Sequence, residues 1–465
     1  MRGTALQSGA GATIAVCTLS GRINADLSLP KLAGTVYAIS GRVDVGTDVG
    51  ADGAASDGRS ATLTIAPGVI FYGASTADWL VVNRGSRVEA VGSASEPIIF
   101  TAVGNVRGER TAEIDSHWRG ITILGRAPIN NCIASTAIGG TAGCEASVRD
   151  ADVRFGGAIE GDNSGTIRFV QIRYTNPYYP PVGPRVGAGL RLAGVGYATT
   201  VDHVQIHDGA NDGLLLYGGR VSIKYLAVTG NRGGGIAAFD GYRGSIQYLV
   251  HRQADFNSSF AINVLNKSGG TDFDALPRTY LRISNATMVH ASNSVNNAIL
   301  VSDGVDFALL NSVLDTNENI LGIWGLPTVR APDDALEDLG PPVFRSALLD
   351  SNGITFDRQS DVGFAQQAAI FGSGTNNNNA TFTTTLLASL ANGPNETAVP
   401  SFDPTPFNAD PYASTPASTP NRMTAVAYVG AIRDASDTAF IGWTCRTSYA
   451  DFGSNSRECG VAPLL

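Results

Sequence analysis

The sequence predicts an all-β solenoid of stacked parallel coils. The first observation is a repeat: three segments between Val201 and Arg252 each read as a short strand in which aliphatic residues alternate with polar ones. Val201 and Val221 are 20 residues apart, and Val221 and Ile246 are 25 apart. A period of about 20–50 residues with one short strand unit each is typical of a solenoid, because one alternating strand cannot bury its apolar face alone.

The second observation is the number of strand-like runs and the scarcity of helices. Runs rich in Val, Ile, Thr and aromatic residues, many of them bounded by Gly, Asn or Asp, predict strands. They cover residues 35–45, 62–72, 79–91, 97–102, 118–124 and 166–174, and similar runs continue to Leu310. Helix patterns are short and confined to residues 334–339, 364–371 and 385–390.

The third observation is a matched pair of asparagines. Asn285 and Asn311 occupy equivalent places in two similar strands, 26 residues apart. Asparagine tolerates left-handed backbone geometry, and stacked asparagines can share side-chain hydrogen bonds from coil to coil. We therefore expect a structural asparagine ladder at one turn of the solenoid.

The two ends of the chain differ in amino-acid composition from its middle. Stacked coils leave strand edges only at the two ends, and residues 1–34 are expected to cap the first coil. The solenoid is expected over residues 35–329. Residues 330–465 are rich in Pro, Asp, Asn and Ser, which predicts loops that wrap the stack. Within them, residues 426–443 are apolar again and predict a closing strand.

Composition limits the function. The net charge is −9 and the pI is about 5.1, which is too acidic for a general nucleic-acid binder. No run approaches the roughly 20 apolar residues of a membrane helix. The N-terminus has no apolar run long enough for a signal peptide, so we expect any export signal to have been removed.

The five cysteines suggest two local disulfides. Cys132 and Cys144 bracket one loop, Cys445 and Cys459 bracket another, and Cys17 is left over. Local pairs of this kind indicate an oxidising compartment. The alternative is a set of five reduced and buried thiols.

The densest polar cluster lies on and beside the repeat. If the protein is an enzyme, its candidate catalytic residues are Asp202, Asp208, Asp212, Asp240, Arg232 and Arg243. Carboxylates on neighbouring coils, about 4.8 Å apart, would fall in or near the ~5–9.5 Å separation that glycoside hydrolysis needs. The alternative is the solvated face of a solenoid strand.

Two further sets could bind ligands. Asp44, Asp48, Asp52 and Asp57 lie in a Gly-rich loop, and hard oxygen ligands on a flexible loop suit Ca²⁺. The alternative is a solvated loop.

An aromatic loop stiffened by prolines contains Tyr174, Tyr178 and Tyr179. Aromatic rings on a rigid loop can stack on sugar faces or anchor a protein partner. The alternative is a loop packed on the outer wall of the stack.

Several short sequence segments resemble those of a known family. They are residues 61–70, 80–92, 96–101, 118–130, 162–174 and 239–244. The set is similar to exported right-handed parallel β-helix proteins of Gram-negative bacteria, a family without a defined activity. The resemblance implies that fold for most of residues 35–260. The turns at 209–213 and 230–235 lack the aspartate runs common in the family, which puts any cation site there in doubt.

These observations favour an exported, non-catalytic β-helix protein at the cell surface or in the extracellular matrix. It would act by binding a glycan or protein, or by assembling with copies of itself. Its rival is a polysaccharide lyase or glycoside hydrolase that uses the polar cluster of residues 202–243. A third hypothesis is an accessory subunit of an outer-membrane transporter.

Overall fold

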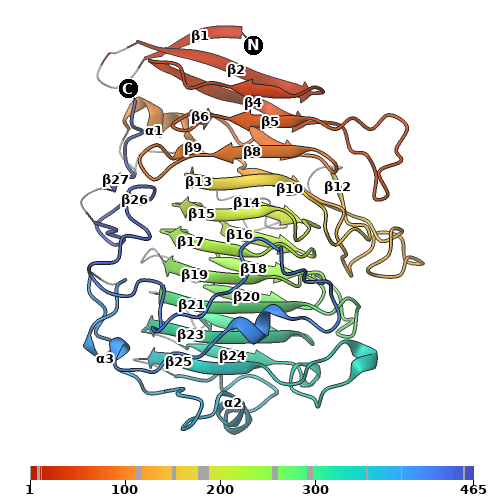
Figure 1. Ribbon diagram of the computed structural model, residues 1–465, viewed down its shortest axis with the longest axis vertical. Coiled ribbons are helices and arrows are strands. Elements are labelled where there is room, and N and C mark those ends of the chain that lie inside the picture. The colour runs from red at the N-terminus through yellow and green to blue at the C-terminus, as the bar shows by residue number, and fades with distance from the viewer. Residues whose placement is uncertain are drawn as a thin grey trace.

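The structure is a computed structural model that describes residues 2–7, 11, 13–109, 118–148, 153–175, 188–253, 260–290, 297–317, 319–351, 354–388, 390–453 and 456–464. Within these ranges 23 strands join one sheet that winds into a tall stack of coils (Figure 1). Except at the N-terminal edge, neighbouring strands of this sheet run parallel. The predicted fold, a right-handed parallel β-helix, is confirmed.

The strands of the stack are β1 (Arg2–Gln7), β2 (Thr13–Ile23), β3 (Leu27–Leu29), β4 (Thr35–Val45), β5 (Thr62–Ile65), β6 (Ile70–Gly73), β7 (Trp79–Val82), β8 (Arg87–Val91), β9 (Ile98–Ala102), β10 (Ile121–Leu124), β13 (Gly165–Arg173), β14 (Ala188–Ala193), β15 (Thr200–His207), β16 (Asp212–Tyr217), β17 (Ile223–Thr229), β18 (Ile236–Phe239), β19 (Ser245–Arg252), β20 (Ile262–Leu265), β21 (Tyr280–His290), β22 (Ile299–Ser302), β23 (Asp306–Thr316), β24 (Leu321–Trp324) and β25 (Val343–Ser351).

Outside the stack lie two short strand pairs, β11 (Ala146–Val148) with β12 (Val153–Phe155) and β26 (Cys445–Arg446) with β27 (Arg457–Glu458). The helices are α1 (Val103–Arg107), α2 (Phe364–Phe371) and α3 (Pro394–Thr397), with 3-10 turns η2 (Leu326–Thr328), η3 (Asp334–Leu336) and η4 (Thr405–Asn408). The helix predicted at 364–371 is therefore confirmed. The one predicted at 334–339 shortens to a 3-10 turn, and residues 385–388 and 390 are not helical.

From β13 onward each full coil has a long bent strand and a short straight one, whereas the coils of β5–β7 and β8–β10 have three short strands each. β13 pairs with β8 through Gly165–Arg168 and with β9 through Val170–Ile172, so one strand spans two faces. β15, β17, β19, β21, β23 and β25 continue this bent stack. The third face is formed by β7, β10, β14, β16, β18, β20, β22 and β24.

The register corrects the predicted repeat. Val201 pairs with Ile223, and Ile223 pairs with Ile246. Val221, the residue taken as the repeat partner, lies two positions earlier, in the turn before β17. Both Val221 and Ile223 are buried in the core. Residues two apart point to the same face of an extended chain, so the alternation alone could not fix the register.

The bend between the first two faces uses left-handed backbone at one equivalent residue in each of seven coils. These residues are Phe169, His203, Tyr225, Tyr248, Asn285, Asn311 and Ser346, and their φ angles lie between 49° and 62°. Such geometry costs a non-glycine residue roughly 1–2 kcal/mol. The equivalent positions and left-handed geometry predicted for Asn285 and Asn311 are confirmed, and the two residues are the lower part of a longer column. Their amides are linked through the Ser284 hydroxyl rather than directly.

The upper part of this column is aromatic. The rings of His203, Tyr225 and Tyr248 stack at successive centroid distances of 4.3 and 4.6 Å, and Phe169 lies 4.4 Å from His203 with its ring tilted by 37°. Offset stacking of this kind contributes about 0.5–1.5 kcal/mol per pair beyond the burial of the rings, which offsets the backbone cost of the bend.

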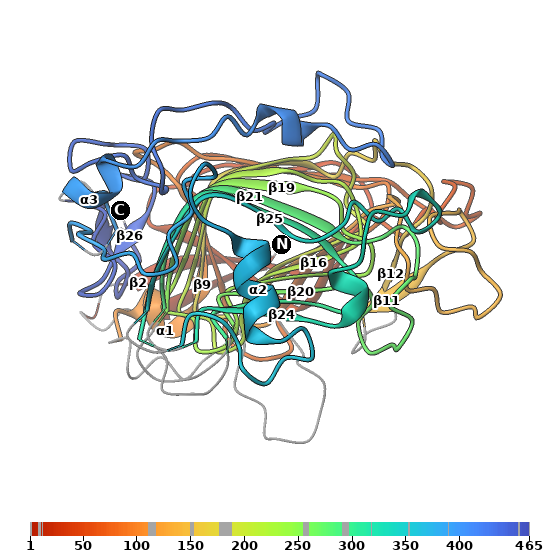
Figure 2. The ribbon, with the colours of Figure 1, turned by 90° about the horizontal axis from the view of Figure 1, so that it is seen from below.

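The two ends of the stack are finished differently. At the N-terminal end β2 and β3 pair with β4 and β5, so residues 13–29 form a further coil, and β1 runs antiparallel to β2. Within the described residues, no strand pairs with the outer edge of β1. At the other end α2 lies across the stack (Figure 2), and its Phe371 packs into the core.

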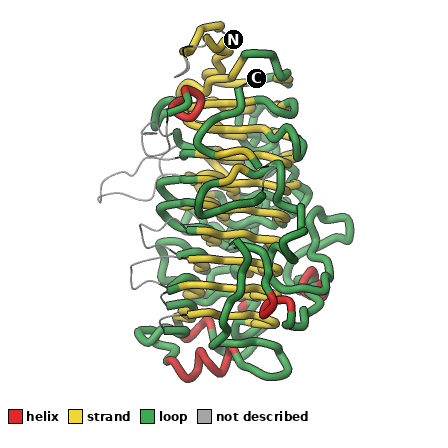
Figure 3. Tube along the Cα trace, turned by 90° about the vertical axis from the view of Figure 1, so that its left-hand side faces the viewer, coloured by secondary structure: helices red, strands yellow, loops and turns green. Residues whose placement is uncertain are grey.

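Residues 390–453 and 456–464, here called the C-terminal strap, return along the outside of the stack toward its N-terminal end (Figures 1 and 3). Side-chain amides on the bent strands bind it. Gln205 Nε2 donates to Cys445 O at 2.9 Å, and Cys445 N donates back to Gln205 Oε1 at 2.6 Å. Gln247 makes the same pair of bonds with Thr424, and Asn311 makes it with Phe402.

These amide contacts replace the closing strand predicted at 426–443, where the structure has no strand. Most of these strap contacts are with side chains of the stack, and one is a backbone bond, from Gly430 N to Asn311 O at 2.8 Å. Both predicted disulfides, Cys132–Cys144 and Cys445–Cys459, are present, and Cys17 is free. Among the described residues, no helix has the length and apolar character needed to cross a membrane.

We predict that Asn311→Ala lowers the free energy of unfolding by about 3 kcal/mol. Two hydrogen bonds to Phe402, about 1 kcal/mol each, are lost, and alanine pays about 1 kcal/mol more in the left-handed region. Urea unfolding followed by tryptophan fluorescence measures the change. Asn311→Gly, which keeps the backbone geometry, should cost about 2 kcal/mol, and equal losses in both variants would contradict the backbone contribution.

Candidate functional site

The predicted catalytic residues lie in separate parts of the coil. Asp208, Asp212 and Arg232 lie in the region where bent strands turn toward the third face, and Asp240 and Arg243 follow β18 at its far end. A strand the length of β16, roughly 20 Å at 3.3 Å per residue, separates these two corners. Asp202 lies elsewhere again, beside the left-handed bend. The structure does not bring the six residues into one groove.

The carboxylates of this set are engaged in structural contacts. Asp212 Oδ1 accepts from Gly234 N at 2.8 Å, Asp208 pairs with Arg232 at 3.9 Å, and Asp202 contacts His203 and Arg168. These interactions join neighbouring coils or flanking residues, which is what a stacked strand requires of its polar side chains.

Asp240 and Arg243 are likewise bound. Asp240 accepts from Ser268 N at 2.7 Å and from Ser268 Oγ at 3.0 Å, and burial raises its pKa to about 6 against the opposing effect of these bonds. Arg243 is fully buried, with bonds of 2.8 and 2.6 Å to Asp410 of the strap. Arg243 therefore fastens the strap to the stack.

The four aspartates proposed for Ca²⁺ are not brought together as one set of ligands. Asp48 forms a two-point ion pair with Arg84, and Asp44 accepts from Arg42 and Asn83. Asp52 accepts from the nearby Ala54 N, while Asp57 is exposed. Arginine side chains, rather than a metal ion, neutralise Asp44 and Asp48.

The aromatic loop is placed only in part. Tyr178 and Tyr179 lie outside the described residues. Tyr174 is buried, and its hydroxyl donates to Cys459 O at 3.0 Å, so its ring is not available to stack on a sugar.

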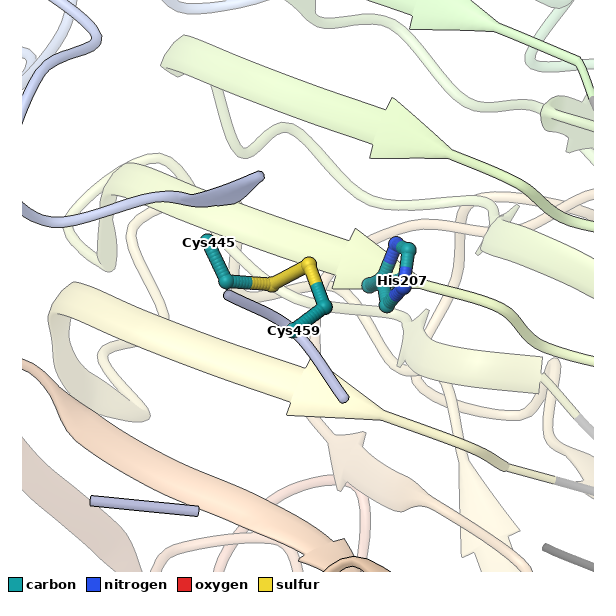
Figure 4. Close-up of side chains that lie close together, drawn as sticks. All are labelled: His207, Cys445 and Cys459. Atoms are coloured by element: carbon teal, nitrogen blue, oxygen red, sulfur yellow. A yellow bond between two sulfur atoms is a disulfide. The ribbon is translucent and has the colours of Figure 1, made fainter. Parts of the chain in front are cut away.

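One group of possible metal ligands remains, and its chemistry argues against a metal. Among the described residues, His207, Cys445 and Cys459 are the only cluster of His, Cys, Asp or Glu close enough to share an ion, with ligand atoms within 4.8 Å of one another. The two sulfurs are bonded to each other (Figure 4). Metal ligation by cysteine needs thiolates, so this disulfide form offers none.

A groove at the N-terminal end is the best candidate for a binding site. Its volume is about 940 Å³. The floor is apolar and comes from outward-facing residues of β2, β4 and β6, namely Ile14, Val36 and Ile70. One wall is the turn of residues 31–35, and the other is formed by residues 106–108 with strap residues 461–464.

A smaller, positively charged pocket of about 130 Å³ adjoins this groove. Lys31, Gly68 and Pro463 line both spaces. Arg173 and Arg457 also line the pocket, from β13 and from β27 of the strap. The groove and the pocket are therefore neighbours that share lining residues, and we treat them together as the candidate site.

Arg173 is the most unusual residue of the pocket. It is fully buried and donates to Gln171 Oε1 and to Cys459 O at 3.1 Å. Burial lowers its pKa to about 10, and the positive charge of Arg457 acts in the same direction. Within the described part of the chain no carboxylate forms an ion pair with it. Its hydrogen bonds go to neutral carbonyl oxygens, whereas buried cations are ordinarily paired with a charge, so an anion would complement it.

Comparison with known proteins places the fold in a family. The model of the pectate-lyase-like β-helix domain matches residues 50–389. This chain belongs to that family. No curated protein and no solved structure matches it. The matched residues contain strands β5 to β25, whereas β1 to β4, the groove residues on them and the strap lie outside the match.

Sequence reasoning missed this site because its parts are scattered. Residues 31–37, 68–70, 106–108 and 461–464 meet only after the coils stack and the strap returns. Arg173 gave no signal in the sequence, since an arginine that ends a strand normally faces water. A search for cations without acidic neighbours would still have needed the fold.

We predict that low pH destabilises the protein through the buried His207 beside this site. Burial, with Arg173 nearby, lowers the His207 pKa to about 3, against an unfolded value near 6.5. The neutral form is therefore required for folding. The contribution is complete above about pH 6.5 and declines by about 1.4 kcal/mol per pH unit as the pH falls toward the folded pKa.

Urea unfolding between pH 7.5 and 4.5 measures this effect. The stability of the wild-type protein relative to His207→Gln should fall at that rate below pH 6.5. Thr229→Val, which removes the hydroxyl that contacts His207 Nδ1, should lower stability but keep the wild-type slope. A His207→Gln slope equal to that of the wild type would contradict the prediction.

Proposed function

We propose that this protein is an exported, non-catalytic β-helix that acts by binding, at the outer surface of a Gram-negative bacterium or outside it. The groove at the N-terminal end is its binding site. The single observation that carries the proposal is an apolar groove beside a cationic pocket, with Lys31, Gly68 and Pro463 in the lining of both. Two disulfides support an oxidising compartment.

The position of the strap supports a binding function over catalysis at residues 202–243. Strap residues Phe440, Trp443 and Phe452 pack against Ala227 and Val250, which face outward from β17 and β19. A long polysaccharide would need that face open. The carboxylates of the predicted catalytic set are also engaged in separate contacts.

The family match favours one second candidate, an enzyme that acts on an extracellular polysaccharide. The matched domain is described as pectate-lyase-like. Fold likeness does not fix the chemistry, because a solenoid of this kind can carry different sites. If the protein is such an enzyme, Asp208 and Asp212 would be its catalytic residues.

We predict no turnover when the purified protein, with Ca²⁺, is given a panel of acidic and neutral polysaccharides. New reducing ends report hydrolysis, and ultraviolet absorbance of unsaturated products reports elimination. The expected signal equals that of the buffer. Turnover that Asp212→Asn abolishes, while Asp57→Asn leaves it intact, would overturn the binding proposal and establish the enzyme.

A further inference from the structure

The floor of the candidate site follows one outward-facing column of side chains. Ile70, Ile99 and Gln171 are paired in successive coils, and Val36 immediately precedes Tyr37, the partner of Phe71. The column changes from apolar to polar along this path. From Val36 to Gln171 it spans three coil spacings, roughly 14 Å.

The strap reaches this column at Gln171, whose Nε2 donates to Trp443 O at 2.5 Å, and covers it further down. Below Gln171, the next residues of the column are Gln205, Ala227 and Val250. Gln205 binds the backbone of Cys445, and Ala227 and Val250 pack against the strap. Residues 461–464 then line the groove, where Ala462 and Leu464 belong to the same apolar cluster as its floor.

The charges are concentrated at the polar end. Lys31, Arg173 and Arg457 line the small pocket, where Glu96 is the one carboxylate and pairs with Lys31 at 2.8 Å. Arg107 lines the adjoining groove and pairs with Glu109 at 3.8 Å. Within the described residues, the unpaired charges are therefore those of Arg173 and Arg457. This local excess of positive charge occurs in a chain whose net charge is −9. A ligand with an anionic end would supply the partner that Arg173 lacks.

We propose that the groove and pocket together bind a long-chain amphiphile whose head group is a carboxylate, sulfate or phosphate. This inference rests on the proposed binding function and names its ligand class. The hydrocarbon chain lies over Val36 and Ile70, and the head group enters the pocket beside Arg173 and Arg457. Free inorganic anions share the head-group chemistry and lack the chain.

Calorimetric titration with octanoate, decanoate and dodecanoate, kept below their micelle concentrations, tests whether the groove binds the hydrocarbon chain of the ligand. Burial of each methylene should tighten binding about four-fold, until the groove is filled. Acetate should bind far more weakly than dodecanoate. Equal affinity across the series would overturn the apolar part of the site.

Decanoate compared with 1-decanol tests the head group. A charge-assisted hydrogen bond to a buried arginine should make decanoate at least about ten-fold tighter than the alcohol. Equal binding of the two would overturn the anionic part of the site, and no saturable binding of either would overturn the proposal.

Substitutions then locate the site. Arg457→Gln, at an exposed position, should weaken decanoate about three-fold and leave 1-decanol unchanged. Arg446→Gln is the matched control, because Arg446 lies on the neighbouring β26 and pairs with Glu458 outside the pocket. Equal effects of the two substitutions would place binding elsewhere.

Two further variants test the wall of the groove and the buried arginine of the pocket. Leu32→Asp, at an exposed residue of the groove wall, should weaken both ligands. Arg173→Gln should abolish the preference for decanoate, and its circular dichroism and urea midpoint show whether it folds. The polysaccharide assay is independent of these titrations. Failure of the amphiphiles without turnover would reject this inference alone, whereas turnover would reject the binding function itself.

Discussion

The structure depends on the pairing of side-chain amides from the stack with backbone groups of the strap. Gln205, Gln247 and Asn311 each satisfy both the N–H and the C=O of one strap residue. A chain that crosses the outside of a solenoid has no strand edge to pair with, and unpaired buried backbone groups are costly. Regularly spaced amides on the coils remove that cost and fix the path of more than sixty residues.

This path determines where a ligand can bind. The strap covers outward-facing residues of β17 and β19, as its apolar contacts with Ala227 and Val250 show. It reaches the upper coils as a wall of the groove, with Arg457 at the pocket and Pro463 where groove and pocket meet. The same segment that covers one face therefore completes the candidate site on the next.

Features of the fold that depend on residues close in sequence could be predicted, whereas those that form only when distant segments meet could not. Alternating strands and the asparagines at 285 and 311 have strong local signatures, and the disulfides link cysteines close in sequence. Phe169 and Tyr225 gave no such signal, because aromatic residues rarely adopt left-handed geometry and only stacking makes it acceptable. The groove could not be predicted, since its floor and walls come from opposite ends of the chain.

Amide hydrogen exchange, read by mass spectrometry on strap peptides that contain Phe402, Thr424 and Cys445, tests this account most directly. If side-chain amides hold the strap, these backbone N–H groups exchange as slowly as those of the central strands β17 and β19, because both open only when the stack opens. Exchange of the strap peptides at the rate of exposed turns such as residues 53–57, while the strands stay protected, would contradict it.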